Sequence, residues 1–175
     1  MEKKWKFIAE ILFILILGTL LHFTYEFFNY NKVAAIFSAV NESTWEHLKL
    51  VYMPFFLLGI ASLISRKKSA GLYVYAKGAG AVIGSFSVII IFYTYTGIIG
   101  RHFLVLDIIT FVIAVFIGFY IYYGLVTEKI RSPKNALIKG LIIFCLTFLL
   151  FLWSTFDPPH INLFMDPTNG SYGID

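Results

Sequence analysis

Five segments of this sequence are long and apolar enough to cross a lipid bilayer as helices: about 5–28, 47–65, 72–99, 103–126 and 136–154. A hydrocarbon core about 30 Å thick needs about 20 helical residues. The chain has 175 residues, of which 59% are hydrophobic and 14% are charged, whereas a soluble domain is about one quarter charged. We therefore predict an all-α integral membrane bundle of about five transmembrane helices, which forms a single domain over residues 1–175.

Two further segments are predicted to lie outside the hydrocarbon core. Residues 29–40 carry apolar side chains on one helical face, which is typical of a short helix in the membrane interface: Val33, Ile36, Phe37 and Val40. Residues 155–175 contain two Asp-Pro steps and an Asn-Gly step, and these turn formers predict a tail without long helices. Because the tail also carries large apolar side chains, we expect it to be ordered and to fold back over the adjacent end of the bundle.

The basic residues indicate the orientation of the chain. Cytoplasmic loops carry an excess of lysine and arginine, and the three basic clusters fall on one side of a five-helix bundle: residues 3–6, 66–68 and 129–134. We predict a multi-pass protein of the cytoplasmic (inner) membrane, with its N-terminus inside and its C-terminus outside. Lys77, Lys139 and Glu10 lie within about two turns of the inner face, and we expect them to snorkel to it.

The histidines gather on the predicted outer side. With this topology all four histidines and seven of the 10 acidic residues lie outside, whereas eleven of the 14 lysine and arginine residues lie inside. The insertion rule explains the basic excess but not the position of the histidines. The basic residues flank apolar segments instead of forming a patch, so no nucleic acid is expected as a partner. The lone Cys145 excludes a disulfide framework within the chain and a cysteine-based zinc site.

Two outer segments carry candidate site residues. His22 and Glu26 are four residues apart near the outer end of the first span, so they share a helical face. Ionisable groups at this depth usually face a cavity or a partner. Either an orienting hydrogen bond between them or a functional site accounts for the pair.

Residues 41–49, with the sequence NESTWEHLK, form the densest polar run. Ser43 followed by Glu46 matches a capping box, which would begin the second span. Capping does not explain the remaining charged or titratable residues of this run: Glu42, His47 and Lys49. The other outer histidine, His102, lies in the turn before the fourth span.

The tail adds Asp157-Pro-Pro-His160 directly after the fifth span. Histidines with carboxylates form the ligand set of catalytic zinc sites, in which one position is left for water. The predicted metal ligands are His22, His47 and His160, with zinc as the expected metal. The predicted catalytic residues are Glu26, Glu46, Asp157 and Lys49. Without a metal, the same groups suit general acid–base work.

The NESxWEHxK run, together with His22 and Glu26 before it and Asp157-Pro-Pro-His160 after the last span, resembles a family of small bacterial polytopic membrane proteins of unknown function. The resemblance covers most of the chain and implies a membrane bundle, but no activity. Seven-helix membrane metallohydrolases and the substrate-binding components of vitamin transporters differ from this chain in helix number and motifs.

Three functions remain open at this point. The first is a metal-dependent membrane enzyme that acts on a lipid or lipid-linked substrate from the outer leaflet. The second is a binding or transport component for a cation or a small solute, which would place ionisable groups near the middle of the membrane. The third is a partner subunit that docks another membrane protein through Gly80 and Gly84, whose spacing favours close helix packing.

Overall fold

The computed structural model describes residues 2–65, 69–127 and 133–174, and side chains from Trp5 onward. Two of the basic clusters used to predict the orientation fall mainly outside the described residues. These are Arg66–Lys68, and Lys129 and Arg131 of the cluster at residues 129–134. The helices are α1 (Glu2–Phe27), α2 (Lys32–Phe37), α3 (Thr44–Ser65), α4 (Ala70–Ile99), α5 (Leu104–Thr127) and α6 (Ala136–Phe156). The described chain has no strand longer than an isolated bridge.

Five of these helices are long and apolar enough to span a membrane, as predicted: α1, α3, α4, α5 and α6. The short α2 also forms where an interfacial helix was expected, and Asn31 caps it by accepting a hydrogen bond from the Val33 amide at 2.8 Å. Val33 and Phe37 are exposed, as an interfacial position requires, while Ala35 packs inside. The chain is therefore an all-α, multi-pass membrane protein.

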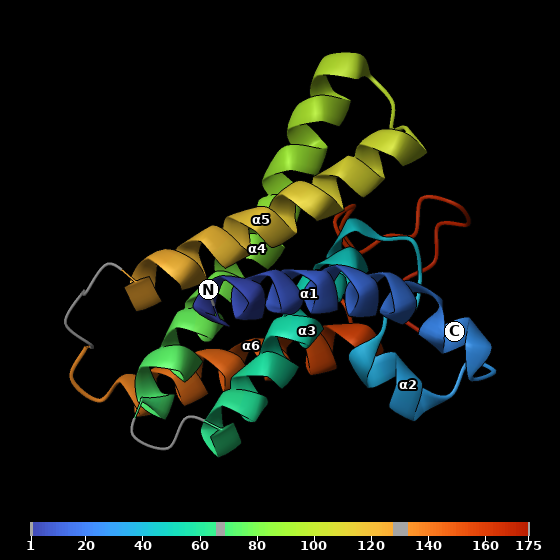
Figure 1. Cartoon of the computed structure of the whole chain (residues 1–175). Helices are drawn as coiled ribbons and strands as arrows, with labels where there is room; N and C mark the ends of the chain where they lie inside the picture. The colour runs from blue at the N-terminus through green and yellow to red at the C-terminus, as the bar shows by residue number, and fades with distance from the viewer. Residues whose placement is uncertain (1, 66–68, 128–132, 175) are drawn as a thin grey trace.

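The long helix α4 lies at the centre of the bundle and packs against α3, α5 and α6 (Figure 1). Helix α1 crosses α3 and also contacts α5, while α2 bridges α1 and α6. The end of α1, the start of α3 and the end of α6 meet on the side of the tail. We call this side the histidine end, because His22 and His47 lie there, and the other side the opposite end.

Close packing between α4 and α5 depends on three glycines. A Cβ at Gly80 would lie 2.4 Å from the Gly118 carbonyl oxygen, and one at Gly84 would lie 3.0 Å from the Gly118 Cα. Small residues let two membrane helices approach in this way. The predicted use of Gly80 and Gly84 to dock another protein is therefore corrected, because α5 of the same chain covers them.

A similar contact joins α1 to α3. Pro54 lies inside α3 and lacks the amide hydrogen that would bond the carbonyl of Leu50 one turn earlier. The Leu50 carbonyl instead faces α1 at Gly18, where a Cβ would lie only 2.5 Å from its oxygen. The glycine thus gives the two helices the close approach that this crossing needs.

The tail folds back on the start of α3, as expected. The Trp45 amide donates to the carbonyl of Leu163 at 3.1 Å, and the Trp45 and Phe164 rings lie 4.6 Å apart. Met165 and Tyr172 form an antiparallel bridge that closes the tail into a loop. The tail is thereby fixed beside the predicted outer site.

Candidate metal-binding site

The local structure before α3 presents His47 and Glu42 to the same side. Ser43 Oγ accepts a hydrogen bond from the Glu46 amide at 3.3 Å, which is one half of the predicted capping box. The other half is absent, because Asn41 Oδ1, and not the Glu46 carboxylate, accepts from the Ser43 amide at 3.0 Å. This cap begins α3 at Thr44 and places His47 on its first turn.

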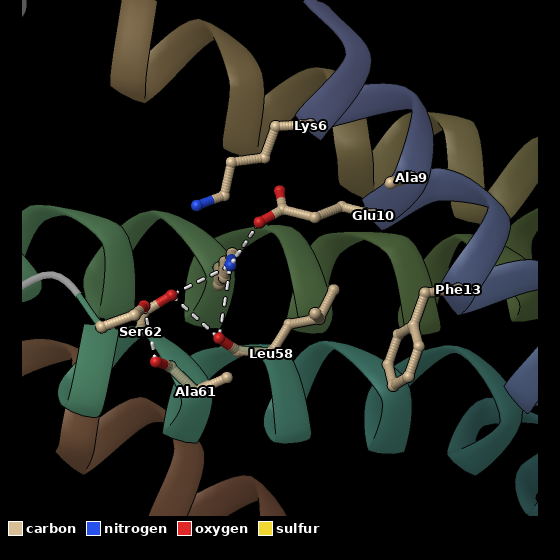
Figure 2. A pocket seen from close by; sticks show the side chains of 9 residues that line it. Lys6, Ala9, Glu10, Phe13, Leu58, Ala61 and Ser62 are labelled. Atoms are coloured by element: carbon tan, nitrogen blue, oxygen red, sulfur yellow. Dashed lines mark hydrogen bonds and ion pairs between the residues drawn. The ribbon is translucent and has the colours of Figure 1, made fainter. Parts of the chain in front are cut away.

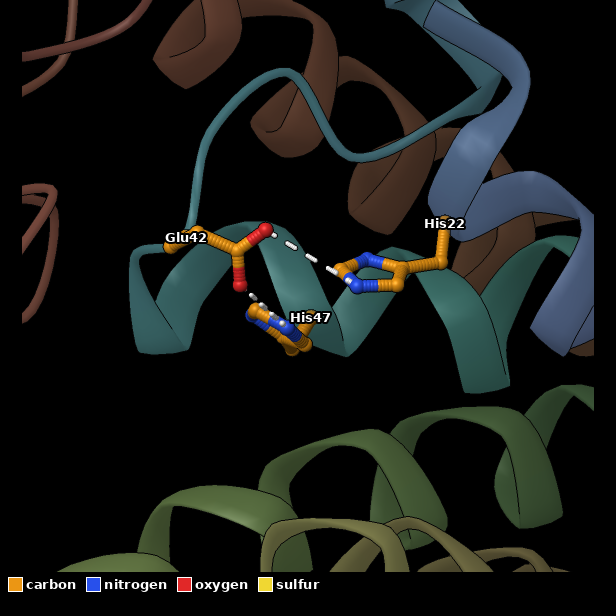
Figure 3. A group of neighbouring side chains, drawn as sticks. All are labelled: His22, Glu42 and His47. Atoms are coloured by element: carbon orange, nitrogen blue, oxygen red, sulfur yellow. Dashed lines mark ion pairs between the residues drawn. The ribbon is translucent and has the colours of Figure 1, made fainter. Parts of the chain in front are cut away.

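His22, Glu42 and His47 form one cluster at the histidine end. Figure 3 shows both imidazole rings directed toward the Glu42 carboxylate, one from α1 and the other from α3. Glu42 Oε1 lies 3.8 Å from His22 Nε2, and Glu42 Oε2 lies 3.6 Å from His47 Nε2. The side chains are 28%, 50% and 31% exposed for His22, Glu42 and His47. The cluster is therefore open to ions and to water.

The Nε2 atoms of both rings face Glu42, and the Nδ1 atoms of the two rings differ in their surroundings. His47 Nδ1 lies 2.8 Å from the carbonyl oxygen of Ser43, so it is the protonated nitrogen in the neutral ring, and Nε2 carries the lone pair. Metal-bound histidines commonly donate their second nitrogen to a backbone carbonyl in this way. His22 Nδ1 is shielded from solvent and has no hydrogen-bond partner in the described part of the chain.

The three side chains are of the types that bind zinc, and their ligand atoms lie somewhat farther apart than in a zinc site. One ligand atom from each of the three residues lies within 4.8 Å of the others. Zinc bonds of about 2.0–2.2 Å place tetrahedral ligand atoms roughly 3.3 Å apart, so the widest separation in the group needs to shorten by up to about 1.5 Å. Rotation of these partly exposed side chains can shorten the distances between their ligand atoms. Two imidazoles and one carboxylate would fill three positions of a tetrahedral zinc site and leave the fourth for water.

The tail holds Glu42 in place. The Glu42 amide donates to Asp166 Oδ2 at 3.1 Å, and Asn41 Nδ2 donates to the Gly173 carbonyl at 3.0 Å. Burial alone would raise the pKa of Asp166, but hydrogen bonds from the Thr168 hydroxyl, the Thr168 amide and the Glu42 amide hold that pKa below its ordinary value. The ionised Asp166 thus orders the loop that presents Glu42.

The structure does not bring every predicted residue to this cluster. Glu26 lies one turn beyond His22 on α1 and is exposed. Asp157 caps the end of α6 and is exposed. His160 is exposed and stacks on Tyr172 with ring centroids 4.4 Å apart. It is not one of the three clustered ligands, and Glu42 takes the third place instead.

Glu46 and Lys49 face away from solvent. Their charged groups lie 2.5 Å apart, and the Lys49 ammonium also donates to the Ala35 carbonyl at 3.1 Å and to the Thr155 hydroxyl at 2.9 Å. Glu46 accepts from the Val40 amide at 3.1 Å. This pair ties α2, α3 and α6 together, and its groups are engaged in structural contacts.

A second buried ion pair lies at the opposite end. Lys77 Nζ of α4 donates to Glu10 Oε1 of α1 at 3.0 Å, and the Tyr122 hydroxyl of α5 donates to Glu10 Oε2 at 2.8 Å. Lys77 is only 2% exposed. The prediction that Lys77 and Glu10 snorkel to the membrane surface is therefore wrong, because each finds its counter-ion inside the bundle.

Sequence reasoning did not include Glu42 among the candidate metal ligands. Its signal was present, since capping left Glu42 without a role, but nothing local showed that its carboxylate lies between two imidazoles. The fourth histidine, His102, lies in the turn after α4, where its Nδ1 contacts Asp107 Oδ2 at 3.2 Å.

The sequence comparison gives the family of the chain. Residues 1–174 match a family of unknown function (DUF6512). The chain belongs to this DUF6512 family. Neither the curated proteins nor the solved structures contain a match. The function must therefore be inferred from the cluster itself.

Proposed function

We propose that this chain is a membrane-embedded, zinc-dependent enzyme that acts on a lipid or lipid-linked substrate at the outer leaflet of the cytoplasmic membrane. The observation that carries the proposal is the convergence of His22, Glu42 and His47, with their ligand atoms within 4.8 Å, on a solvent-accessible end of a membrane bundle. Zinc bound there would lower the pKa of its water to about 7 and polarise an ester or phosphoester.

The chain's own residues supply the remaining roles. Glu26 is exposed one turn from His22 and is not one of the clustered residues, so we assign to its carboxylate the role of taking a proton from the attacking water and returning it to the leaving oxygen. Glu46 and Lys49, which sequence reasoning assigned to catalysis, are engaged with each other, so we assign them to holding the site.

The surroundings favour a lipid as the substrate. A shallow groove of about 330 Å³ runs along α1 and is lined by Leu15, Ile16, Thr19 and Leu20. Leu15, Thr19 and His22 follow one another at helical spacing, so the groove lies below the cluster, toward the membrane interior. An acyl chain in this groove would hold an ester or a phosphate near His22.

Zinc analysis tests the site. The wild type, purified in detergent without chelator, should hold about one zinc per chain, and His22→Ala, His47→Ala and Glu42→Ala should each lose it. His102→Ala, which changes an exposed histidine outside the cluster, should keep it. A wild type with no stoichiometric metal and no thermal shift on adding zinc would overturn the metal site.

Turnover needs its own measurement. Zinc-loaded wild type in vesicles of extracted bacterial lipids should release products that mass spectrometry detects, and Glu26→Gln should bind zinc but release none. If Glu26→Gln and His22→Ala matched the wild type in product formation, the enzyme proposal would fail.

The buried ion pairs within the spans favour a second candidate, a transport or binding component. Glu10 and Lys77 place an ion pair inside the bundle, toward its opposite end, and transporters also use ionisable groups within their spans, typically near the middle of the membrane. This candidate predicts that liposomes containing the protein take up zinc in a His22-dependent manner, whereas the enzyme leaves zinc uptake unchanged.

A further inference from the structure

A cavity of about 320 Å³ lies between α1 and α3 at the opposite end, far from the histidine cluster. Figure 2 shows the Lys6 side chain reaching toward it beside Glu10, with Phe13 and Leu58 also at its wall. Its volume is at the lower limit of small-molecule sites, which are about 300–1,000 Å³.

The lining changes from polar to apolar with depth. Lys6 and Ser65 lie near the ends of α1 and α3, whereas Phe13 and Leu58 each lie seven residues further into the bundle. At 1.5 Å per residue, the apolar walls are about 10 Å deeper than the polar ones. A phospholipid has this same order of polarity, but a free inorganic anion has no apolar part to fill the deeper half.

The charge of the cavity favours an anion. The Glu10 carboxylate is neutralised by Lys77 at 3.0 Å and receives a further hydrogen bond from Tyr122. The Lys77 ammonium is occupied as well, since it also donates to Ser62 Oγ at 3.0 Å and to the Leu58 carbonyl at 3.2 Å. Lys6 makes no ion pair within the described part of the chain, so its charge is the one left over.

We propose that this cavity binds the phosphate-bearing headgroup of an anionic phospholipid. Lys6 contacts the phosphate, Ser65 lies at the headgroup level, and the first part of an acyl chain packs against Phe13 and Leu58. Basic pockets between membrane helices recognise lipid phosphates in this manner. The buried Glu10–Lys77 pair holds α1, α3 and α4 around the cavity and remains paired when the lipid binds.

Native mass spectrometry with defined lipids tests this site. Wild-type protein should retain one phosphatidylglycerol molecule more strongly than a phosphatidylcholine with the same acyl chains. Lys6→Ala should weaken phosphatidylglycerol binding about fivefold, the effect expected for one lysine near a phosphate. Lys32→Ala, which removes an exposed lysine on α2, should leave binding unchanged.

Three outcomes would overturn the proposal. One is equal retention of the two lipids by the wild type, and another is an unchanged phosphatidylglycerol affinity in Lys6→Ala. The third is displacement of the lipid by glycerol phosphate at similar concentration, which would identify a soluble anion as the ligand. Unchanged zinc content and melting temperature in Lys6→Ala would show that the fold and the histidine cluster are intact, so this site and the proposed enzyme site fail separately.

Discussion

Glu46 and Lys49 form an ion pair, with 2.5 Å between Oε2 and Nζ, at a position where neither side chain is more than 3% exposed. Removing one partner of such a pair leaves an uncompensated buried charge, which costs about 3–5 kcal/mol. Lys49→Met should therefore lower the melting temperature strongly, whereas Lys32→Met at an exposed position should change it little.

The double variant Glu46→Gln/Lys49→Met supplies the sharper comparison. It leaves no unpaired charge, so its melting temperature should lie above that of Lys49→Met alone. Thermal unfolding followed by fluorescence in detergent measures all three variants. If the double variant had the lowest melting temperature of the three, an unpaired Glu46 charge would not be the reason why Lys49→Met is destabilised.

A second prediction concerns the α4–α5 contact. A Cβ at Gly118 would lie 2.6 Å from the Gly80 carbonyl oxygen, so Gly118→Ala must push the two helices apart. Overpacking of this kind costs about 1–3 kcal/mol. Gly124→Ala on the same helix meets no atom within 4 Å and should be neutral or slightly stabilising. Equal melting temperatures for the two variants would contradict this packing.

The hydrogen bonds of Asp166 predict a pH dependence. They hold its folded pKa below the ordinary 3.8, so the stability they contribute is fully present above about pH 4 and is lost as the pH falls through the folded pKa. Asp166→Asn should lower the melting temperature at pH 7, and its difference from wild type should shrink on acidification below pH 4. Exposed Asp157→Asn is the control, and a difference that grew toward low pH would reverse the sign of this argument.

The predicted orientation is open to a direct test. A reporter that is active only outside the cytoplasm should work when fused after Asp175, and a cytoplasmic reporter should work when inserted at Arg66–Lys68. This follows from the basic excess that cytoplasmic loops carry. The reverse pattern would place the histidine cluster in the cytoplasm and would exclude an outer-leaflet substrate.

The sequence by itself determined the number of spans, the short interfacial helix and the ordered tail. Bilayer thickness sets the length of a spanning helix, so a run of apolar residues is sufficient to identify one. Turn-forming and apolar residues in the tail likewise predict its fold from local sequence alone. His22 and His47 could be singled out for the same reason, because polar groups are rare at that depth.

Only the tertiary structure decided which charged groups meet. Glu42 lies between the two imidazoles because Asp166, more than 120 residues later, holds its backbone. Lys77 stayed inside because Glu10 and Tyr122 arrive from two other helices. Lys49 is likewise buried, and its ammonium donates hydrogen bonds to the Ala35 carbonyl and the Thr155 hydroxyl. Helical spacing shows which residues share a face of one helix. The residues that this face contacts depend on how separate helices pack, and the local sequence does not specify that packing.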